Sequence, residues 1–211
     1  MHSKDAEPNK LEPKTDTAAT SAQVVDRHEL RRHYRHLRTT LPDHIRQAAE
    51  QSICQTLLTL ESVTGRVAAY VASNGEPNLT HWMKHTSSRI FLPRVEGESM
   101  SFHAWHPETP LHPNRWGIGE PNAESPQAIA KDLQVVLLPL VAFDHQGHRL
   151  GMGGGYYDRF LAAKETHPKR IGVAFDCQAH QNLPAQPWDI PLEAVVTESG
   201  IHHFEPTQTT N

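Results

Sequence analysis

Cysteine is scarce in this sequence. Its 211 residues include only Cys54 and Cys177, which lie far apart and have no metal-ligand spacing. This distribution argues against a cysteine zinc site and favours the reducing cytoplasm as the location of the protein. Long hydrophobic runs are also missing, because no segment is long and apolar enough to span a membrane. We therefore expect a cytoplasmic protein without a membrane partner.

An excess of positive charge is missing as well. The formal net charge is −4, whereas proteins that bind nucleic acid commonly carry a broad basic surface. This composition predicts no nucleic-acid partner and favours small-molecule ligands that are bound locally. The sequence contains 16 histidines but no HExxH motif. We interpret the histidines as solvated side chains, most clearly at His112, His145, His148 and His167.

The chain length suits one globular domain with tails. Residues 1–25 are rich in polar residues, alanine and proline and show no periodicity, which is typical of a disordered extension. Residues 26–200 carry the periodic apolar pattern and are predicted to form the domain. Residues 201–211 are predicted to be a flexible C-terminal tail.

Two amphipathic helices are predicted at the start of the domain. In the first, apolar residues recur at helical spacing, at Leu30, Tyr34, Leu37 and Leu41. A stripe of arginines lies about a quarter turn away, at Arg27, Arg31, Arg35 and Arg38. The second helix begins after Pro42 and ends before Gly65.

Short apolar runs then alternate with helical segments. Strands are predicted at residues 66–72, 89–95, 99–105, 134–143, 170–175 and 194–199, and helices at 78–86 and 156–165. This alternation predicts a single α/β domain with a largely parallel sheet flanked by helices. Such an arrangement is Rossmann-like and similar to the fold of sugar-phosphate isomerases and CoA transferases.

The segment RLGMGGGYYDRF, residues 149–160, follows the longest predicted strand and precedes a helix. In α/β proteins this is where ligands bind. Backbone N–H groups at glycines can approach an anion closely because no Cβ intervenes, and Arg149 and Arg159 supply positive charge. The segment therefore predicts a phosphate-binding loop, with a plain strand-to-helix turn as the alternative. It matches neither the GxGxxG dinucleotide motif nor the P-loop.

Asp158, within this segment, has two interpretations. An aspartate in the first turn of a helix commonly serves as a cap or complements the helix dipole. Beside bound phosphate, the same carboxylate could hold Mg²⁺, which needs few protein ligands. The residue types alone leave both interpretations open.

The longer segment PLVAFDHQGHRLGMGGGYYDRFL closely resembles the signature of the 5-formyltetrahydrofolate cyclo-ligase (5,10-methenyltetrahydrofolate synthetase) family. Further matches are RHELR, YVASNGE, RIFLPRV, WGIGEPN and LPAQPWDIPLEAVVTE, so that the resemblance covers roughly residues 26–198. It implies an ATP-dependent ligase that converts 5-formyltetrahydrofolate to 5,10-methenyltetrahydrofolate and releases ADP and phosphate. The implied route is phosphorylation of the formyl oxygen followed by ring closure by N10.

The resemblance also implies roles for individual residues. ATP contacts are implied for Arg27, Arg31, Arg149, Leu150, Gly151, Met152, Gly153, Gly154, Gly155, Tyr156 and Tyr157. Folate contacts are implied for Val71, Glu76, Trp116, Met152, Gly153, Gly154, Gly155 and Tyr156. Asp158 and Asp189 are implied as Mg²⁺ ligands, and Arg149 and Asp158 as catalytic residues. The chain departs from the family at Arg27, where lysine is frequent, and at Leu79, where threonine is common.

Plainer alternatives exist for several of these residues. Arg27 and Arg31 could form a solvated helix edge, Glu76 and Asp189 could be turn residues, and Val71 and Trp116 could belong to the core. Two other functions also stay open, a folate or nucleotide sensor without turnover and a phosphate-handling isomerase or transferase. The expected partners are 5-formyltetrahydrofolate and ATP, and we expect a monomer.

Overall fold

A computed structural model of the protein describes residues 26–162 and 168–205. The predicted N-terminal extension, residues 1–25, lies outside the described residues, as do residues 206–211 of the predicted tail. Residues 163–167, at the end of the helix predicted at 156–165, also lie outside them.

The described helices and strands follow the alternation expected from the sequence. The α-helices are α1 (Arg27–Thr39), α2 (Asp43–Thr59), α3 (Thr80–His85) and α4 (Tyr156–Leu161), with 3₁₀ turns at Ala130–Asp132 and Asp176–Gln178. The strands are β1 (Arg66–Ala68), β2 (Arg89–Glu96), β3 (Ser99–Trp105), β4 (His112–Pro113), β5 (Gly119–Glu120), β6 (Gln127–Ala128), β7 (Val135–Pro139), β8 (Ala142–Asp144), β9 (Arg149–Leu150), β10 (Lys169–Val173), β11 (Ala179–His180), β12 (Ala194–Thr197) and β13 (Gly200–His203).

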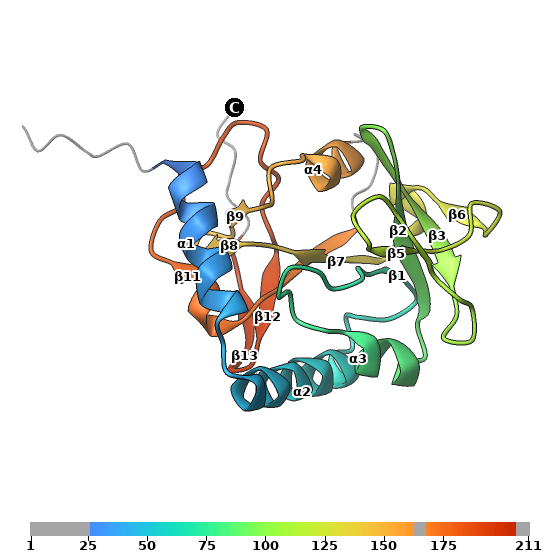
Figure 1. Ribbon diagram of the computed structural model, residues 1–211, viewed down its shortest axis with the longest axis horizontal. Helices are drawn as coiled ribbons and strands as arrows, with labels where there is room; N and C mark the ends of the chain where they lie inside the picture. Colours follow the sequence, from blue (N-terminus) through green and yellow to red (C-terminus); the bar gives the residue numbers. More distant parts are fainter. Residues whose placement is uncertain (1–25, 163–167, 206–211) are drawn as a thin grey trace, which may run out of the picture.

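An 8-stranded sheet in the order β13-β12-β10-β7-β1-β2-β3-β6 forms the centre of the domain (Figure 1). Neighbouring strands from β12 to β2 are parallel, whereas β13, β3 and β6 add antiparallel pairs at the two edges. Because parallel strands require crossover connections, helices cover both faces of this sheet. The α/β fold predicted from the sequence is confirmed.

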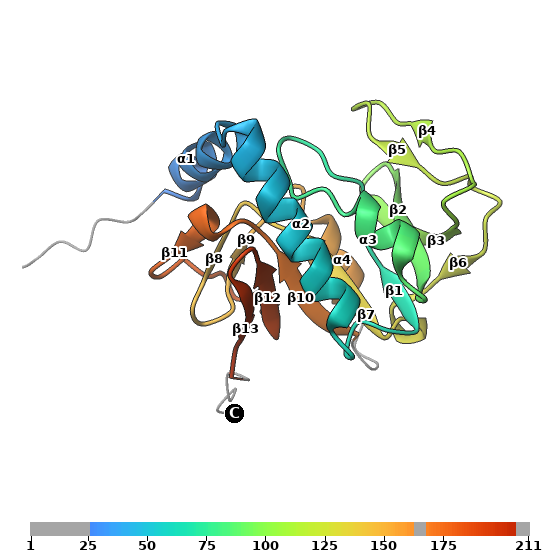
Figure 2. The same ribbon diagram turned by 90° about the horizontal axis from the view of Figure 1, so that it is seen from below.

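Both faces of the sheet are buried by apolar side chains. Along β7, Val135 and Leu137 point into the cluster under α2 and α3, while Val136 and Leu138 point into the cluster beside α4. This alternation explains why the sequence of β7 is a continuous apolar run rather than an alternating one. Figures 1 and 2 show α2 and α3 on one face of the sheet and α4 on the other.

Helix α1 packs at the side of the large sheet, next to a 3-stranded sheet of β11, β8 and β9. Its buried Leu30 and Tyr34 form a third cluster with Ala142 and Leu150 of this smaller sheet and with Val141, which precedes β8. The Asp26 carboxylate accepts a hydrogen bond from the backbone N–H of His28 and so caps the helix. Helix α1 is therefore held against the β8–β9 hairpin. This hairpin leads into residues 151–155, called the glycine loop below.

The structure differs from the sequence prediction where strands end. The strand predicted at residues 134–143 is divided, because β7 ends at Pro139 and β8 belongs to the smaller sheet. Between them, the Leu140 carbonyl accepts hydrogen bonds from the side chains of Arg38 and Gln178 instead of from a strand. Strand β13, Gly200–His203, includes the first residues of the segment 201–211 that was predicted as a C-terminal tail.

Candidate functional site

One large pocket opens at the carboxyl ends of β1 and β7, where α/β folds commonly place ligands. Its volume is about 1050 Å³, near the upper limit of the range typical of ligand pockets. Its walls come from α1, the segment after β1, β2, the β4–β5 hairpin, the glycine loop and the segment around Asp189. A pocket of this size can accommodate two substrates side by side.

The glycine loop connects β9 to α4 and forms one wall of the pocket. Gly153 and Gly155 have φ angles of +102° and +66°, which side chains other than glycine rarely adopt. A Cβ at Gly155 would lie 2.6 Å from an Nη of Arg159. The β8–β9 hairpin separates this loop from β7, so the loop does not follow the longest strand directly, as the sequence suggested.

Arginines line the end of the pocket beside the glycine loop. Arg27 pairs with Asp189 at 2.6 Å, and Arg149 pairs with Asp158 at 2.5 Å. The Nε of Arg31 donates to the Gly151 carbonyl at 2.9 Å. Burial and the neighbouring Arg27 lower the pKa of Arg31. Carboxylates pair with two of the arginines that an incoming polyphosphate could contact.

Arg149 is the most enclosed of these cations, with 6% of its surface exposed. Its Nη2 bonds Asp158, while its Nε is buried without a hydrogen-bond partner among the described residues. Unpartnered buried donors are rare in folded proteins and often mark functional sites. Arg149 therefore has an unused donor close to the glycine loop.

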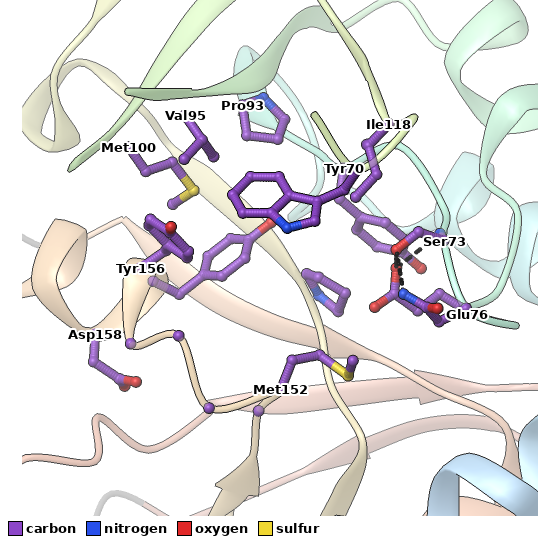
Figure 3. Close-up of a pocket in the computed structure, with 18 of the residues that line it drawn as sticks. Tyr70, Ser73, Glu76, Pro93, Val95, Met100, Ile118, Met152, Tyr156 and Asp158 are labelled. Carbon is purple, nitrogen blue, oxygen red and sulfur yellow. Dashed lines mark hydrogen bonds between the residues drawn. The ribbon is translucent and has the colours of Figure 1, made fainter. Parts of the chain in front are cut away.

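The other side of the pocket is mainly apolar. Tyr70, Pro93, Val95, Met100 and Ile118 gather there, and Figure 3 shows Asp158 and Glu76 on opposite sides of the space between them. The Tyr70 hydroxyl donates to the Pro77 carbonyl at 2.8 Å, which fixes the ring. An apolar wall with few polar groups is suited to a flat organic ligand.

Glu76 is a buried carboxylate at this apolar side, with 8% of its surface exposed. Its Oε2 accepts from the backbone N–H and the hydroxyl of Ser73, at 3.0 and 3.4 Å, and its Oε1 lies 3.6 Å from Arg38. Burial raises the pKa of Glu76, while Arg38 and the hydrogen bonds from Ser73 act in the opposite direction. Asn74, with a φ of +48°, makes the turn that returns this carboxylate to the pocket.

Trp116 stands on the β4–β5 hairpin and is 51% exposed. The guanidinium of Arg115 lies 4.0 Å from its ring centroid. The hairpin is anchored by Glu120, which accepts from the backbone N–H of Val95 and from the Asn114 side chain. Trp116 is therefore a partly exposed wall of the pocket and not a core residue.

The structure brings most of the predicted site residues to this single pocket. Those that line it are Arg27, Arg31, Val71, Glu76, Trp116, Arg149, Gly151, Met152, Gly153, Gly154, Gly155, Tyr156, Tyr157, Asp158 and Asp189. Leu150 is different, since its side chain is buried in the cluster with Leu30 and Tyr34. The alternation of side chains along β9 explains the difference, because Arg149 and Leu150 point in opposite directions.

Two sequence interpretations need correction. His148 is not a freely solvated side chain, because its Nδ1 lies 3.0 Å from the buried carboxylate of Asp144. The same carboxylate accepts from the backbone N–H groups of Gln146, His148 and Leu183. Arg38 was placed in an arginine stripe but is fully buried. Neither outcome follows from helical or loop spacing, since both depend on contacts with distant segments.

The pocket also contains residues that the sequence did not single out. Tyr70 and Ser73 belong to the turn that carries Glu76, and Trp188 precedes Asp189 and is 68% exposed. Among residues 26–162 and 168–205, no cluster of three or more histidine, cysteine, aspartate or glutamate side chains could hold a metal ion. Two carboxylates can still suffice for Mg²⁺ that arrives with a phosphate ligand, because waters and phosphate oxygens complete its coordination.

Comparisons with known proteins agree on one family. A model of the 5-formyltetrahydrofolate cyclo-ligase family matches residues 23–198. The 5-formyltetrahydrofolate cyclo-ligase of Haemophilus influenzae is 34% identical over 180 residues, which cover 79% of this chain and 94% of the relative. That of Escherichia coli K12 is 38% identical over 143 residues, covering 64% and 79%.

Solved structures give the same result. The NMR structure of Aquifex aeolicus 5,10-methenyltetrahydrofolate synthetase aligns with a TM-score of 0.75 and 31% identity, covering 88% of this chain and 96% of that one. A synthetase from Mycoplasma pneumoniae aligns with a TM-score of 0.67 and 25% identity, covering 82% and 99%. The family model spans most of the sequence and the Haemophilus relative is matched over nearly its whole length, so this chain belongs to the 5-formyltetrahydrofolate cyclo-ligase family.

Proposed function

We propose that the protein converts 5-formyltetrahydrofolate to 5,10-methenyltetrahydrofolate with consumption of ATP and release of ADP and phosphate. The observation that carries this proposal is the composition of the large pocket. Its arginine and glycine side is suited to a polyphosphate, and its apolar side with the buried Glu76 is suited to a flat heterocycle. Transfer of the γ-phosphoryl group from ATP to the formyl oxygen needs both sides open to the same space.

We place the triphosphate beside the glycine loop, within reach of Arg27, Arg31 and Arg149. Backbone N–H groups at Gly153 and Gly155 add donors that have no Cβ of their own beside them. Helix α4 has only 6 residues, so its dipole adds little, and the arginines supply most of the positive charge. Phosphate oxygens would replace the carboxylates that pair with Arg27 and Arg149.

We place the pteridine ring against Tyr70, Val95 and Ile118, with Trp116 at the open side. The 2-amino-4-oxopyrimidine edge of a pterin presents two neighbouring N–H donors. A carboxylate accepts such a pair well when it is ionised. Two buried carboxylates line this side of the pocket, Glu76 and Glu120, and Glu120 already anchors the β4–β5 hairpin. We therefore assign the orientation of the pteridine to Glu76.

The chemistry starts from a poor electrophile, since the N5 nitrogen donates electrons into the formyl carbonyl. The formyl oxygen attacks the γ-phosphorus, ADP leaves, and an N5-iminium phosphate forms. N10 then adds to the iminium carbon and loses its proton, and cleavage of the carbon–oxygen bond releases inorganic phosphate. The protein contributes alignment of the two substrates and charge complementarity at the transferred phosphoryl group.

Mg²⁺ is proposed as the metal that accompanies ATP, with Asp158 and Asp189 as its protein ligands, and it would neutralise charge on the phosphate oxygens. The donor set fits, because both carboxylates line the pocket next to arginines assigned to phosphate. Arg149 would move its Nη2 contact from Asp158 to phosphate, which frees the carboxylate.

The direct test is an assay with purified protein, 5-formyltetrahydrofolate, ATP and Mg²⁺. We expect 5,10-methenyltetrahydrofolate to form, as followed by its near-ultraviolet absorbance, with one phosphate released for each product molecule. Omission of any one component should abolish both signals. Binding of either substrate without turnover would favour the sensor interpretation. Turnover of a sugar phosphate or an acyl-CoA without ATP would favour the isomerase or transferase interpretation.

Glu76→Gln is expected to raise the KM for 5-formyltetrahydrofolate by about ten- to a hundredfold, because a charge-assisted hydrogen bond is lost. The KM for ATP should change by less than about threefold. Glu50→Gln is the matched control, since Glu50 is a partly buried carboxylate on α2 that bonds the backbone N–H of Asn78 outside the pocket. Equal losses for both substrates in the Glu76 variant would show that Glu76 has a structural role.

We further propose that the protein acts as a cytoplasmic monomer. Both substrates can be bound by residues of one chain, since every wall of the pocket comes from the same domain. None of the helices in the described part of the chain is long and apolar enough to cross a membrane. Light scattering coupled to size-exclusion chromatography checks the oligomeric state.

A further inference from the structure

Arg38, near the end of α1, is an arginine with no exposed surface. Arginine is seldom fully buried, because its charge must be compensated by partners within the protein. Arg35, one turn earlier on the same helix, is exposed to solvent. Groups in the interior of the protein must therefore compensate the charge of the Arg38 guanidinium.

The guanidinium of Arg38 contacts four residues from three segments. Nε donates to the Asn74 carbonyl at 3.0 Å, and Nη1 donates to the Leu140 carbonyl at 2.8 Å. Nη2 lies 3.6 Å from Oε1 of Glu76 and 3.8 Å from the sulfur of Met152 in the glycine loop. The N–H groups of the guanidinium point in different directions, so only the planar fork of arginine can reach all of these acceptors.

We propose that Arg38 is a positioning residue for the substrate reaction, which keeps the Glu76 carboxylate ionised and aimed at the pteridine. This inference rests on the proposed function, because it concerns how Glu76 binds the folate. Arg38 itself lies behind Glu76 and is not among the residues that line the pocket. It therefore acts through Glu76 rather than by touching the substrate.

The charge of Arg38 opposes the effect of burial on Glu76. Burial favours the protonated carboxyl group and raises its pKa, whereas the neighbouring guanidinium lowers it. A protonated Glu76 would lose acceptor strength toward the two pterin donors. Without the Arg38 charge, the ionised form of Glu76 would depend mainly on two hydrogen bonds from Ser73.

Other titratable groups near Glu76 do not replace Arg38. The phenols of Tyr70 and Tyr157 have pKa values raised by burial, so they stay neutral at physiological pH. Arg35 and Arg46 lie near Arg38 and lower its pKa, which acts with burial against its charge. Arg46 also donates to the carbonyls of Arg38 and Gly75, so it is bound to the backbone rather than to Glu76.

The test compares wild type, Arg38→Gln and Arg38→Lys, with Arg35→Gln as the control from the exposed side of the same helix. The KM for each substrate is measured between about pH 6 and about pH 9, the range in which a buried carboxyl group can titrate. In Arg38→Gln we expect the folate KM to rise by about tenfold or more at low pH. The difference in folate KM between Arg38→Gln and wild type should become smaller as pH increases and Glu76 ionises.

Two variants separate a charge effect from a general structural one. Arg38→Lys keeps a positive charge, so its pH profile should stay close to that of wild type. In Arg38→Gln/Glu76→Gln the pH dependence should disappear, and the folate KM should be close to that of Glu76→Gln alone. The proposal would be overturned if Arg38→Gln raised the folate KM by the same factor at all pH values. It would also be overturned if the folate KM of the double variant rose by the product of the two single-variant factors.

A titration of the Glu76 carboxyl carbon by ¹³C NMR gives a readout that needs no turnover. Its signal is assigned as the one missing from Glu76→Gln. The midpoint should move to higher pH in Arg38→Gln and stay nearly unchanged in Arg35→Gln. Absence of turnover in wild type would defeat the proposed function, whereas an unmoved Glu76 midpoint would defeat the role of Arg38. If Arg38→Gln does not fold, the same titration is made with Arg38→Met, a neutral side chain of similar length, for which the same shift of the Glu76 midpoint is expected.

Discussion

Replacement of Asp158 by asparagine is expected to lower kcat by at least about a hundredfold while the protein stays folded. The substitution keeps the size of the side chain and removes its charge. Asp158 lines the pocket at the start of α4 and pairs with Arg149, so the variant loses a proposed Mg²⁺ ligand and the partner of a nearly buried arginine. The Mg²⁺ concentration that gives half-maximal turnover should rise together with the loss in kcat.

Asp176→Asn provides the control for this variant. Asp176 is an exposed aspartate that begins a 3₁₀ turn outside the pocket, so its substitution should leave kcat within about twofold of wild type. Steady-state kinetics with a Mg²⁺ titration and a thermal melt are made for both variants. Near-normal turnover by Asp158→Asn would remove Asp158 from the metal site.

Arg149→Lys is expected to lower kcat/KM for ATP by about a hundred- to a thousandfold. Lysine keeps one positive charge but offers no planar fork, so it cannot bond Asp158 and phosphate from one rigid group. The buried Nε of Arg149 has no hydrogen-bond partner among the described residues, and lysine has no donor at that position. We expect the KM for 5-formyltetrahydrofolate to change much less than the ATP parameters.

Arg170→Lys is the matched control for Arg149→Lys. Arg170, in β10, is partly buried and pairs with Glu193 at 2.8 Å. Like Arg149, it has a buried Nε without a partner among the described residues. It does not line the pocket, so its substitution should affect stability slightly and kinetics little. Comparable kinetic losses in the two variants would show that the Arg149 effect comes from packing rather than from phosphate contact.

The fold could be predicted from the sequence because its helices and strands are marked by patterns of neighbouring residues. Strands such as β3 are continuous apolar or alternating runs, and the amphipathic pattern marks α1 and α2 before any contact is known. The division of the run at residues 134–143 was not predictable from the same information. It depends on side chains of Arg38 and Gln178, which come from distant segments to bond the Leu140 carbonyl.

For the site, prediction from the sequence was limited even more by contacts between distant segments. The glycine loop could be recognised as a phosphate-binding candidate from residue types alone, and the family motifs added Glu76, Asp158 and Asp189. The burial of Arg38 could not be found this way, because its stripe on α1 has the spacing of a solvated helix edge. Only the three-dimensional structure shows that the last arginine of that stripe is buried.

Helix α1 carries Arg27, Arg31 and Arg38 on nearly the same face, since their positions fall within an arc of about 40° at 100° per residue. The 11 positions from Arg27 to Arg38 correspond to about 16 Å along the axis. Inserting one residue after Arg31 would rotate Arg38 by about 100° relative to the two arginines before it. During evolution, α1 could therefore lengthen or shorten at its ends, but a change between Arg31 and Arg38 would uncouple the two halves of the pocket. A related chain with such an insertion should have lost either its phosphate contacts or its buried arginine.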